Sequence, residues 1–351
     1  MIQVLEEFSA RISAARAAGT ALRLRGGGTK DWYGQDMQGE VFDTRAYRGI
    51  VAYDPTELFI TARCGTPLAE VEAALAAQGQ MLAFEPPHFG PGATIGGAVA
   101  SGLAGPRRQA QGALRDFVLG AVLMDGAGQV AHFGGQVMKN VAGYDVSRLL
   151  AGSLGTLGLI LEVSLKVLPR PPAEATLRFE LGQDEAIRRL NTWGGQPLPI
   201  SASAWHDDLL TVRLSGAAPA VEAAARHMGG ADFPDAGPFW LGVRELQHDF
   251  FAGDAPLWRL SLPSTAPPLA EGGAQLIEWG GAQRWTRSAL PAGELRAALR
   301  ARGGHATQFR GGRRADVFEP LALPIAAIHR NLKRAFDPAG VFNPGRMYKD
   351  F

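Results

Sequence analysis

The sequence predicts an α+β protein of two domains, the second of which contains a mostly antiparallel sheet. The chain has 351 residues, and a single hydrophobic core rarely serves more than ~250 residues. Strand-like and helix-like patterns alternate on both sides of Pro169-Arg170-Pro171-Pro172, a run that cannot continue a strand ladder. We therefore expect domains over 1–170 and 171–325, followed by a helix and tail over 326–351.

Composition and charge exclude several classes of protein. Lys and Arg number 35 against 34 Asp and Glu, so we expect no nucleic-acid binding through phosphate neutralisation. The single cysteine, Cys64, cannot form an internal disulfide, and the seven histidines never recur at the i, i+4 spacing of a helical zinc site. No segment has the ~18 consecutive apolar residues of a membrane span. These observations predict a cytoplasmic protein without a metal site.

The first part of the chain alternates helix and strand patterns. Apolar residues recur every three or four positions up to Gly19, which predicts an amphipathic helix over 2–18. Thr66-Pro67 offers the N-cap and first residue of a second helix, which ends at Gly79. The short β-type runs of this part lie at 21–25, 49–53 and 58–63.

The next segments are rich in glycine. Residues 85–112 are too long and too glycine-rich for an idle connection, so we interpret them as a binding segment. Asp125-Gly126 predicts the turn of a β-hairpin. The run after Gly158 predicts one strand with five apolar residues on the same face, namely Leu159, Leu161, Val163, Leu165 and Val167.

The second half mixes strands with helices. Its strand-like segments are 176–181, 209–215, 257–262, 275–279 and 306–310. Its helix candidates lie near 184–192, 218–228 and 293–302, and one more helix covers 323–336. The remaining tail is rich in turn residues.

A glycine loop follows the strand at 21–25 directly. Consecutive glycines allow φ > 0, so their N–H groups can point into one concavity that holds a phosphate. The loop consists of Arg25, Gly26, Gly27, Gly28, Thr29 and Lys30. It matches neither the Walker spacing nor GxGxxG. The alternative is a tight turn that carries an exposed lysine.

A second glycine motif, PGATIGGAVASGLAG, begins at Pro91. Gly96, Gly97 and Gly102 would let the backbone approach a flat or anionic group, and Thr94 and Ser101 offer hydroxyl donors. The alternative is a flexible surface loop. Ile95 and the other apolar residues of the motif argue against a solvated loop.

These motifs, followed in order by GALRD, KNVAGYD and GSLGTLG, resemble the vanillyl-alcohol-oxidase type of flavoprotein, whose FAD domain is called the PCMH fold. The resemblance spans most of 20–168 and implies a PCMH-type FAD-binding domain over 1–170. It implies that the C-terminal tail returns to that domain. The cofactor-binding residues that it implicates are Arg25, Gly26, Gly27, Gly28, Thr29, Lys30, Pro91, Thr94, Ile95, Gly96, Gly97, Ser101, Gly102, Arg115, Asp116, Gly155, Gly158, Ile160 and Asn343.

Within that type, the chain is similar over nearly its full length to the FAD-binding E subunits of bacterial glycolate oxidase (glycolate dehydrogenase) complexes. The late GGHATQFRGG and the closing FDPAGVFNPGRMY carry this resemblance. It implies oxidation of glycolate or another short 2-hydroxy acid beside a catalytic flavoprotein subunit and an iron–sulfur subunit. It also implies a cytoplasmic protein, peripheral to the inner membrane through its partners. One cysteine cannot hold a cluster, so any iron–sulfur cluster belongs to a partner.

Two departures from the family pattern concern the chemistry. No histidine adjoins the glycine loop, where covalent members attach flavin, so the resemblance implies noncovalent FAD. The His-Gly-acid-Gly-Asn-x-His motif of the catalytic relatives is missing, and His305 is only a weak candidate for a catalytic base. An ordinary histidine at a strand edge is the alternative.

Other polar and aromatic residues carry competing interpretations. Tyr144 and Asp145 match a motif near the cofactor, but Asp145 is equally suited to cap the next helix. Arg107-Arg108 could contact a phosphate or face water, and we expect water as the default. Trp279 and Trp285 are expected in the core or at a subunit interface.

Three functions remain open at this point. The first is the FAD-binding subunit of the complex. The second is a self-sufficient FAD oxidase, which requires a working base in the second domain. The third is a noncatalytic scaffold that keeps a flavin pocket only to hold its partner.

Overall fold

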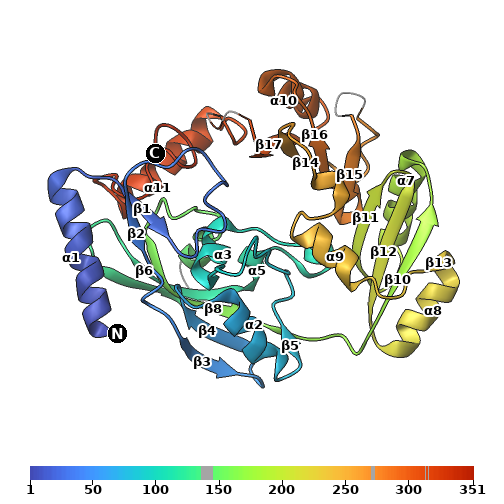
Figure 1. The fold of residues 1–351 in the computed structure, drawn as a ribbon, viewed down its shortest axis with the longest axis horizontal. Helices are drawn as coiled ribbons and strands as arrows, with labels where there is room; N and C mark the ends of the chain where they lie inside the picture. The colour runs from blue at the N-terminus through green and yellow to red at the C-terminus, as the bar shows by residue number, and fades with distance from the viewer. Residues whose placement is uncertain (136–144, 270–272, 313, 315) are drawn as a thin grey trace.

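The computed structural model describes residues 1–135, 145–269, 273–312, 314 and 316–351. Its elements form two halves that lie side by side, each with its own sheet (Figure 1). None of the helices in these residues is long and apolar enough to cross a membrane. The two sheets share no strand within the described ranges, which supports the boundary that we place near residue 170.

The first half is built on a five-stranded sheet in which each strand is antiparallel to its neighbours. In spatial order the strands are β3 (Ile50–Asp54), β4 (Phe59–Arg63), β8 (Leu159–Lys166), β6 (Val118–Met124) and β7 (Val130–Gly134). Helices α2 (Leu68–Ala76) and α3 (Ile95–Ser101) pack on its apolar core. The shorter elements are β5 (Gln80–Met81), α4 (Arg108–Gln111), α5 (Leu114–Phe117), α6 (Val146–Leu149) and β9 (Leu168–Pro169).

A second apolar cluster covers the opposite side of this sheet. Helix α1 (Ile2–Ala18) contributes Phe8 and Ile12 to it. The helix ends at Gly19, whose φ of 64° confirms the predicted cap. The parallel pair β1 (Leu22–Arg25) and β2 (Glu40–Asp43) lies beside it and leads into the glycine loop.

The prediction that five apolar residues of β8 share one face is wrong. The register between β6 and β8 shifts by one residue between Val122 and Leu123, which indicates a β-bulge. An extra residue reverses the alternation beyond it. As a result Leu159 and Leu161 lie in the cluster under α1, whereas Val163 lies with Leu165 and Val167 in the core under α2 and α3.

The start of α2 also differs from the prediction by one residue. The helix begins at Leu68, and Pro67 occupies the N-cap position without a side-chain cap bond. The hydroxyl of Thr66 instead accepts a hydrogen bond from the backbone N–H of Gly49 at 2.8 Å. A tertiary contact thus uses the hydroxyl that the sequence assigned to the cap.

The second half contains an eight-stranded sheet in which every pair is antiparallel, as predicted. In spatial order its strands are β13 (Ala231–Asp232), β10 (Ala173–Glu180), β12 (Leu209–Gly216), β11 (Ile200–His206), β15 (Gln275–Glu278), β16 (Gln283–Arg287), β14 (Leu257–Ser261) and β17 (His305–Arg310). Its helical elements are α7 (Gln183–Gly194), α8 (Ala218–Met228), α9 (Gly237–Arg244), η1 (Asp249–Phe251), η2 (Trp279–Gly281) and α10 (Ala292–Arg300).

Helices cover both faces of this sheet. Helices α7 and α8 pack against one face through an apolar cluster. Helix α9, which the sequence analysis did not identify, packs against the other face around Trp240, Ala202 and Ala204. The opposite faces of the sheet therefore have separate cores.

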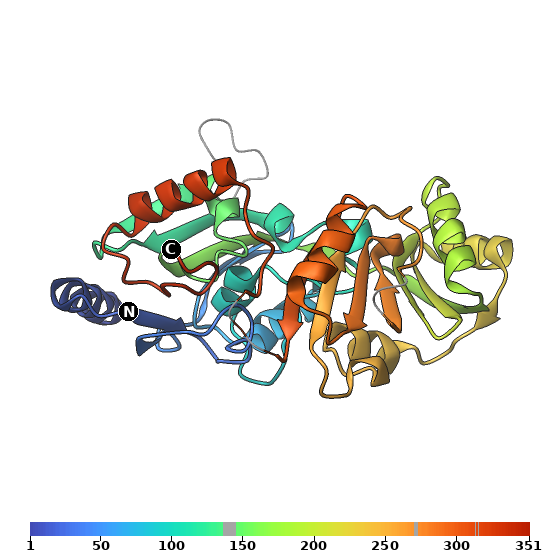
Figure 2. The same ribbon diagram turned by 90° about the horizontal axis from the view of Figure 1, so that it is seen from above.

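The chain returns to the first half at its end. Helix α11 (Leu323–Phe336) lies across the five-stranded sheet (Figure 2), and Phe336 contacts Phe133 with ring centroids 6.1 Å apart. The buried Lys333 amine donates to the carbonyl of Thr156 and to the carboxylate of Asp337. Phe342 then forms a bridge with Leu22 of β1. The tail therefore lies next to the strand that delivers the glycine loop.

Polar contacts hold the two halves together. The carboxylate of Glu245, just after α9, accepts the backbone N–H of His88 at 3.1 Å and that of Phe89 at 2.7 Å. The guanidinium of Arg107 pairs with Glu85 and Glu174 and is almost fully buried. The expectation that Arg107 faces water is therefore wrong, because two acidic side chains compensate its charge.

Candidate cofactor-binding site

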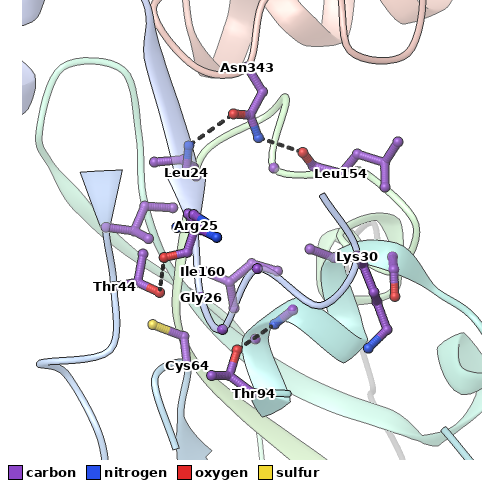
Figure 3. A pocket seen from close by; sticks show the side chains of 18 of the residues that line it. Leu24, Arg25, Gly26, Lys30, Thr44, Cys64, Thr94, Leu154, Ile160 and Asn343 are labelled. Carbon is purple, nitrogen blue, oxygen red and sulfur yellow. Dashed lines mark hydrogen bonds between the residues drawn. The ribbon is translucent and has the colours of Figure 1, made fainter. Parts of the chain in front are cut away.

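A pocket lies where β1, the glycine loop, α3 and the C-terminal tail meet (Figure 3). The empty space in it, with its open mouth, is about 720 Å³. The predicted residues that line it are Arg25, Gly26, Gly27, Gly28, Thr29, Lys30, Thr94, Gly96, Gly97, Ser101, Gly155, Gly158, Ile160 and Asn343. The lining residues that sequence reasoning missed are Leu24, Asp31, Thr44, Cys64, Ala100, Leu154, Leu159 and Arg346.

The glycine loop packs directly on the segment that precedes α3. A Cβ on Gly27 would lie 1.5 Å from the carbonyl oxygen of Gly92, and a Cβ on Gly26 would lie 2.3 Å from Oγ1 of Thr94. Of the three glycines only Gly28 has a positive φ, +73°. The expectation of φ > 0 at Gly27 is therefore wrong. Glycine is required there because a Cβ would collide with the backbone of Gly92.

Lys30 is buried at the side of the pocket. Its amine donates to the carbonyl oxygen of His88 at 3.2 Å and lies 5.5 Å from the centroid of the Phe89 ring. Burial lowers the pKa of the Lys30 amine to about 8, while the charge of Glu245 acts in the opposite direction. The alternative of an exposed lysine on a tight turn is thus wrong for this residue.

Two arginines flank the loop. The Nε of Arg25 pairs with the carboxylate of Asp31 at 2.7 Å. Arg346, from the C-terminal tail, donates to the backbone carbonyls of Lys30 and Tyr33. Its Nε is buried and has no hydrogen-bond partner within the described residues. An anion bound beside this guanidinium would supply the partner that the nitrogen lacks.

The beginning of α3 forms the floor beneath the loop. Oγ1 of Thr94 caps the helix by accepting the N–H of Gly97 at 3.2 Å. A Cβ on Gly96 would lie 2.6 Å from the Cβ of Cys64. The Ser101 hydroxyl already donates to the carbonyl of Ala98, so its hydrogen is not the free donor that we expected.

Asn343 joins two walls of the pocket (Figure 3). Its Oδ1 accepts the N–H of Leu24 at 2.9 Å, and its Nδ2 donates to the carbonyl of Leu154 at 2.6 Å. Gly155 follows in a left-handed conformation with φ +71°, and a Cβ there would lie 2.8 Å from Nδ2 of Asn343. This one amide therefore holds the glycine-loop strand against the GSLGTLG segment.

Cys64 reaches the pocket from the end of β4 (Figure 3). Its side chain is buried, and burial raises the pKa of the thiol to about 12. The group is therefore a neutral thiol at physiological pH.

The site fits the pyrophosphate of FAD. Backbone at Gly26, Gly27 and Gly28 lines one wall, and the buried cations Lys30 and Arg346 lie beside it. The unpartnered Nε of Arg346 provides a donor for a phosphate oxygen. Gly96 and Gly97 would border the same ligand from α3.

Five predicted binding residues do not line the pocket. Pro91 is exposed, Ile95 is part of the apolar core, and Gly102 is the left-handed C-cap of α3. Arg115 and Asp116 are exposed at α5, and Nε of Arg115 lies 3.9 Å from Oδ1 of Asp116.

The remaining candidates also have clear positions. His305 is exposed at the start of β17 and does not line the pocket. Asp145 caps α6 by accepting the N–H of Arg148, which confirms its capping interpretation, whereas Tyr144 lies outside the described residues. Trp285 is buried in an apolar cluster shared by both halves, and Trp279 donates to the carbonyl of Gly105. The core assignment is confirmed for Trp285, whereas Trp279 is half-buried and lies outside the apolar clusters.

A separate cavity lies between the halves, and its empty space is about 320 Å³ with the open solvent at its mouth. Glu278, at the end of β15, lines it and is buried; its Oε2 accepts from Nε1 of Trp285 at 2.6 Å and from Nε2 of Gln283 at 3.0 Å. Burial raises the pKa of this carboxyl to about 7. Arg259 lines the same cavity and donates to the hydroxyl of Tyr33. Sequence reasoning missed Glu278 because a lone glutamate after an apolar strand carries no signal.

Within the described residues, no group of three or more His, Cys, Asp or Glu side chains is arranged to hold a metal ion. The glycine backbone of the cofactor pocket and the buried cations Lys30 and Arg346 suit an anionic ligand. The charged side chains Glu278 and Arg259 line the separate cavity between the halves.

Comparison with known proteins agrees with this geometry. A family model described as an FAD binding domain matches residues 3–134. The chain is 50% identical over 340 residues to the glycolate oxidase subunit GlcE of Escherichia coli (strain K12), which covers 97% of this chain and 96% of that protein. It is 33% identical over 128 residues to the glycolate oxidase subunit GlcD of Bacillus subtilis (strain 168), covering 36% of this chain and 27% of that protein.

Solved structures show the same fold at low sequence identity. An alkyldihydroxyacetonephosphate synthase structure superposes with a TM-score of 0.65 and 14% identity, covering 97% of this chain and 75% of that one. A PCMH-type FAD-binding domain next to a half with an antiparallel sheet is therefore the architecture, as predicted. The extent of the match to the Escherichia coli protein shows that this chain belongs to the family of the glycolate oxidase subunit GlcE.

Proposed function

We propose that this chain is the FAD-binding subunit of a glycolate oxidase complex that oxidises glycolate, or a related short 2-hydroxy acid, to glyoxylate. The observation that carries the proposal is the pocket of glycine backbone, Lys30 and Arg346 in a chain of this family. The chemistry that FAD would supply when bound is acceptance of a hydride from the hydroxyl-bearing carbon of the substrate. The glycine loop, Lys30 and Arg346 would bind the pyrophosphate of FAD. The carbonyl of His88 accepts from the Lys30 amine and so positions it beside the pocket.

We further propose that FAD is bound noncovalently. Of the described residues that line the pocket, none is histidine, and Cys64 is the thiol among them. A thiol with a pKa of about 12 is a poor nucleophile at neutral pH.

The partners in this proposal are a catalytic flavoprotein subunit and an iron–sulfur subunit, which receives the electrons. The name of the family's Escherichia coli member, a glycolate oxidase subunit, supports an assembly. Because one cysteine cannot bind a cluster, an iron–sulfur cluster that receives the electrons would belong to another chain. We place the complex in the cytoplasm, peripheral to the inner membrane through its partners.

The experiment that tests the proposal is anaerobic mixing of the purified, flavin-loaded chain with glycolate and with D-lactate, alone and with the candidate partners. We expect little bleaching of the flavin in the isolated chain and turnover in the reconstituted complex. A colourless preparation that binds no added FAD would instead support the noncatalytic scaffold.

Glu278 favours a second candidate, the self-sufficient oxidase. A carboxyl with a pKa of about 7 is suited to accept the hydroxyl proton of an alcohol, and Arg259 in the same cavity suits a substrate carboxylate. Rapid bleaching by glycolate in the isolated chain, lost in Glu278→Gln, would establish this candidate in place of the first.

A further inference from the structure

A third cavity lies on the α9 face of the eight-stranded sheet and shares no lining residue with the cofactor pocket. Its volume is about 550 Å³ with its mouth. The strand register places Arg178 of β10 opposite Thr211 of β12, and Thr211 opposite Ala204 of β11. His206 follows two residues after Ala204 and so lies on the same face. The small side chain of Ala204 leaves space between the arginine and the histidine.

Among the described residues, Arg178 has no acidic ion-pair partner and contacts aromatic rings instead. Its guanidinium carbon lies 3.4 Å from the centroid of the Phe233 ring and 5.7 Å from that of Phe239. Within the described residues its side chain makes no ion pair or hydrogen bond, and its Nε is buried without a partner. Stacking holds the planar group in place but leaves its donors unused, which is unusual for a partly buried arginine.

Two histidines meet edge to face at the same cavity, with ring centroids 5.8 Å apart. Nδ1 of His206 lies 3.0 Å from the carbonyl oxygen of Gln275, an acceptor, so this nitrogen carries the proton. Nδ1 of His248 accepts the N–H of Phe250, so in the neutral ring Nε2 carries the proton. The backbone thus fixes both tautomers.

The charges around His248 are mainly positive. Burial lowers its pKa, and the charges of His206 and Arg178 lower it further, whereas Asp249 acts in the opposite direction. Asp207 lies at the rim of the cavity and is exposed to solvent. An anion among Arg178, His206 and His248 would relieve this repulsion.

We propose that this cavity binds a small oxyanion, a carboxylate or a phosphate, at Arg178. The guanidinium would supply a bidentate donor pair, and the buried Thr211 hydroxyl, which makes no hydrogen bond within the described residues, would supply a third donor. Phe239 and Leu276 provide apolar walls. The inference does not depend on the proposed function, because the cofactor pocket contributes nothing to this cavity.

The test is a titration of the flavin-loaded full chain with acetate and, separately, with inorganic phosphate, followed by nuclear magnetic resonance of its histidine rings. Bound anion should raise the pKa of His248 by about one unit or more. A response to acetate alone identifies a carboxylate site, and a response to phosphate alone identifies a phosphate site.

Three variants decide whether the response belongs to this cavity. Arg178→Met keeps the stacked stem and should weaken anion binding about tenfold or more. It should also raise the pKa of His248 without anion, because a positive neighbour is lost. Thr211→Val keeps the shape and should weaken binding less, which preserves the test if Arg178→Met folds poorly. Arg226→Met, at an exposed arginine of α8, is the control and should bind like the unaltered chain.

The proposal is overturned if neither anion shifts the resonances of His206 and His248 up to ~10 mM. It is equally overturned if Arg178→Met and Thr211→Val both bind as tightly as the unaltered chain, since that result would describe a nonspecific anion effect.

Discussion

Gly27 and Gly92 pack so closely that a Cβ on Gly27 would lie 1.5 Å from the carbonyl oxygen of Gly92. This contact joins the two glycine motifs, which are more than sixty residues apart in the sequence. No rotation of a side chain can relieve it, because both partners are backbone. The conformation of the glycine loop is therefore set by its packing against Gly92, within the chain itself.

We predict that Gly27→Ala abolishes FAD binding. The added methyl group must displace the loop from Gly92 and so shift the glycine backbone that lines the pocket. The ratio of flavin to protein after gel filtration measures the effect, and circular dichroism checks folding. Gly194→Ala is the matched control, because a Cβ there meets nothing within 4 Å. A folded Gly27→Ala chain with full FAD occupancy would remove the basis for the cofactor assignment.

We predict that FAD affinity falls as the pH rises above about 8. Burial lowers the pKa of Lys30 to about 8, so its charge, which attracts the pyrophosphate, is lost above that pH. Lys30→Met should weaken FAD binding about tenfold at pH 7 and flatten the pH profile. Fluorescence titration from pH 6 to 10 measures both. An unchanged profile in Lys30→Met would show that another group titrates.

The same pKa has a consequence for the stability of the apoprotein. The folded value, about 8, lies below the ordinary value of 10.5, so between these values the unfolded chain binds more protons than the folded one. The buried charged amine therefore lowers the free energy of unfolding below pH 8. This penalty shrinks as the pH rises from about 8 to 10.5, and it returns as the pH falls through the same window. Bound FAD should reduce the penalty, because its negative charge compensates the buried ammonium.

We predict that Asn343→Ala weakens FAD binding and lowers the free energy of unfolding by ~1–3 kcal/mol for each buried group left without its partner. The groups affected are the N–H of Leu24 and the carbonyl of Leu154. Urea unfolding and FAD titration provide the two measurements. Asn331→Ala, at an exposed asparagine of α11, is the control. Equal behaviour of the two variants would mean that the amide bridge contributes nothing.

We predict that acid precipitation releases all the flavin into the supernatant. The pellet should be colourless, because the Cys64 thiol, with a pKa of about 12, stays protonated at neutral pH. For the same reason Cys64 in the folded protein should resist iodoacetamide at pH 8 and react only after unfolding. Yellow colour in a washed pellet, absent in Cys64→Ala, would establish a covalent bond.

We predict that His305→Ala leaves most of the glycolate activity of the complex, because this side chain is exposed and lies outside the cofactor pocket. Glu278→Gln is the informative comparison, since it keeps an oxygen for Trp285 and removes the base. A loss of ~10²-fold, the scale of a missing general base, would be expected in Glu278→Gln only if this chain performs the chemistry. The same loss in His305→Ala would instead identify His305 as the base.

The sequence by itself determined the order and type of most elements. The periodicity up to Gly19 and the glycine-flanked strands are local patterns, and they specify a helix over 2–18 and the strand before Arg25 without tertiary information. The glycine loop, the later GSLGTLG segment and Asn343 were recognisable for the same reason, since their motifs are contiguous in the chain.

Tertiary structure alone decided which charges are buried and which residues meet. Lys30 is buried because His88, Phe89 and the distant Glu245 close over it. Arg346 reaches the pocket only because α11 returns to the first half. Glu278 and Arg178 are ordinary residues of strand-like segments, and their unusual environments result from neighbours on other strands. Burial and charge compensation depend on contacts between remote segments, so no local pattern could predict them.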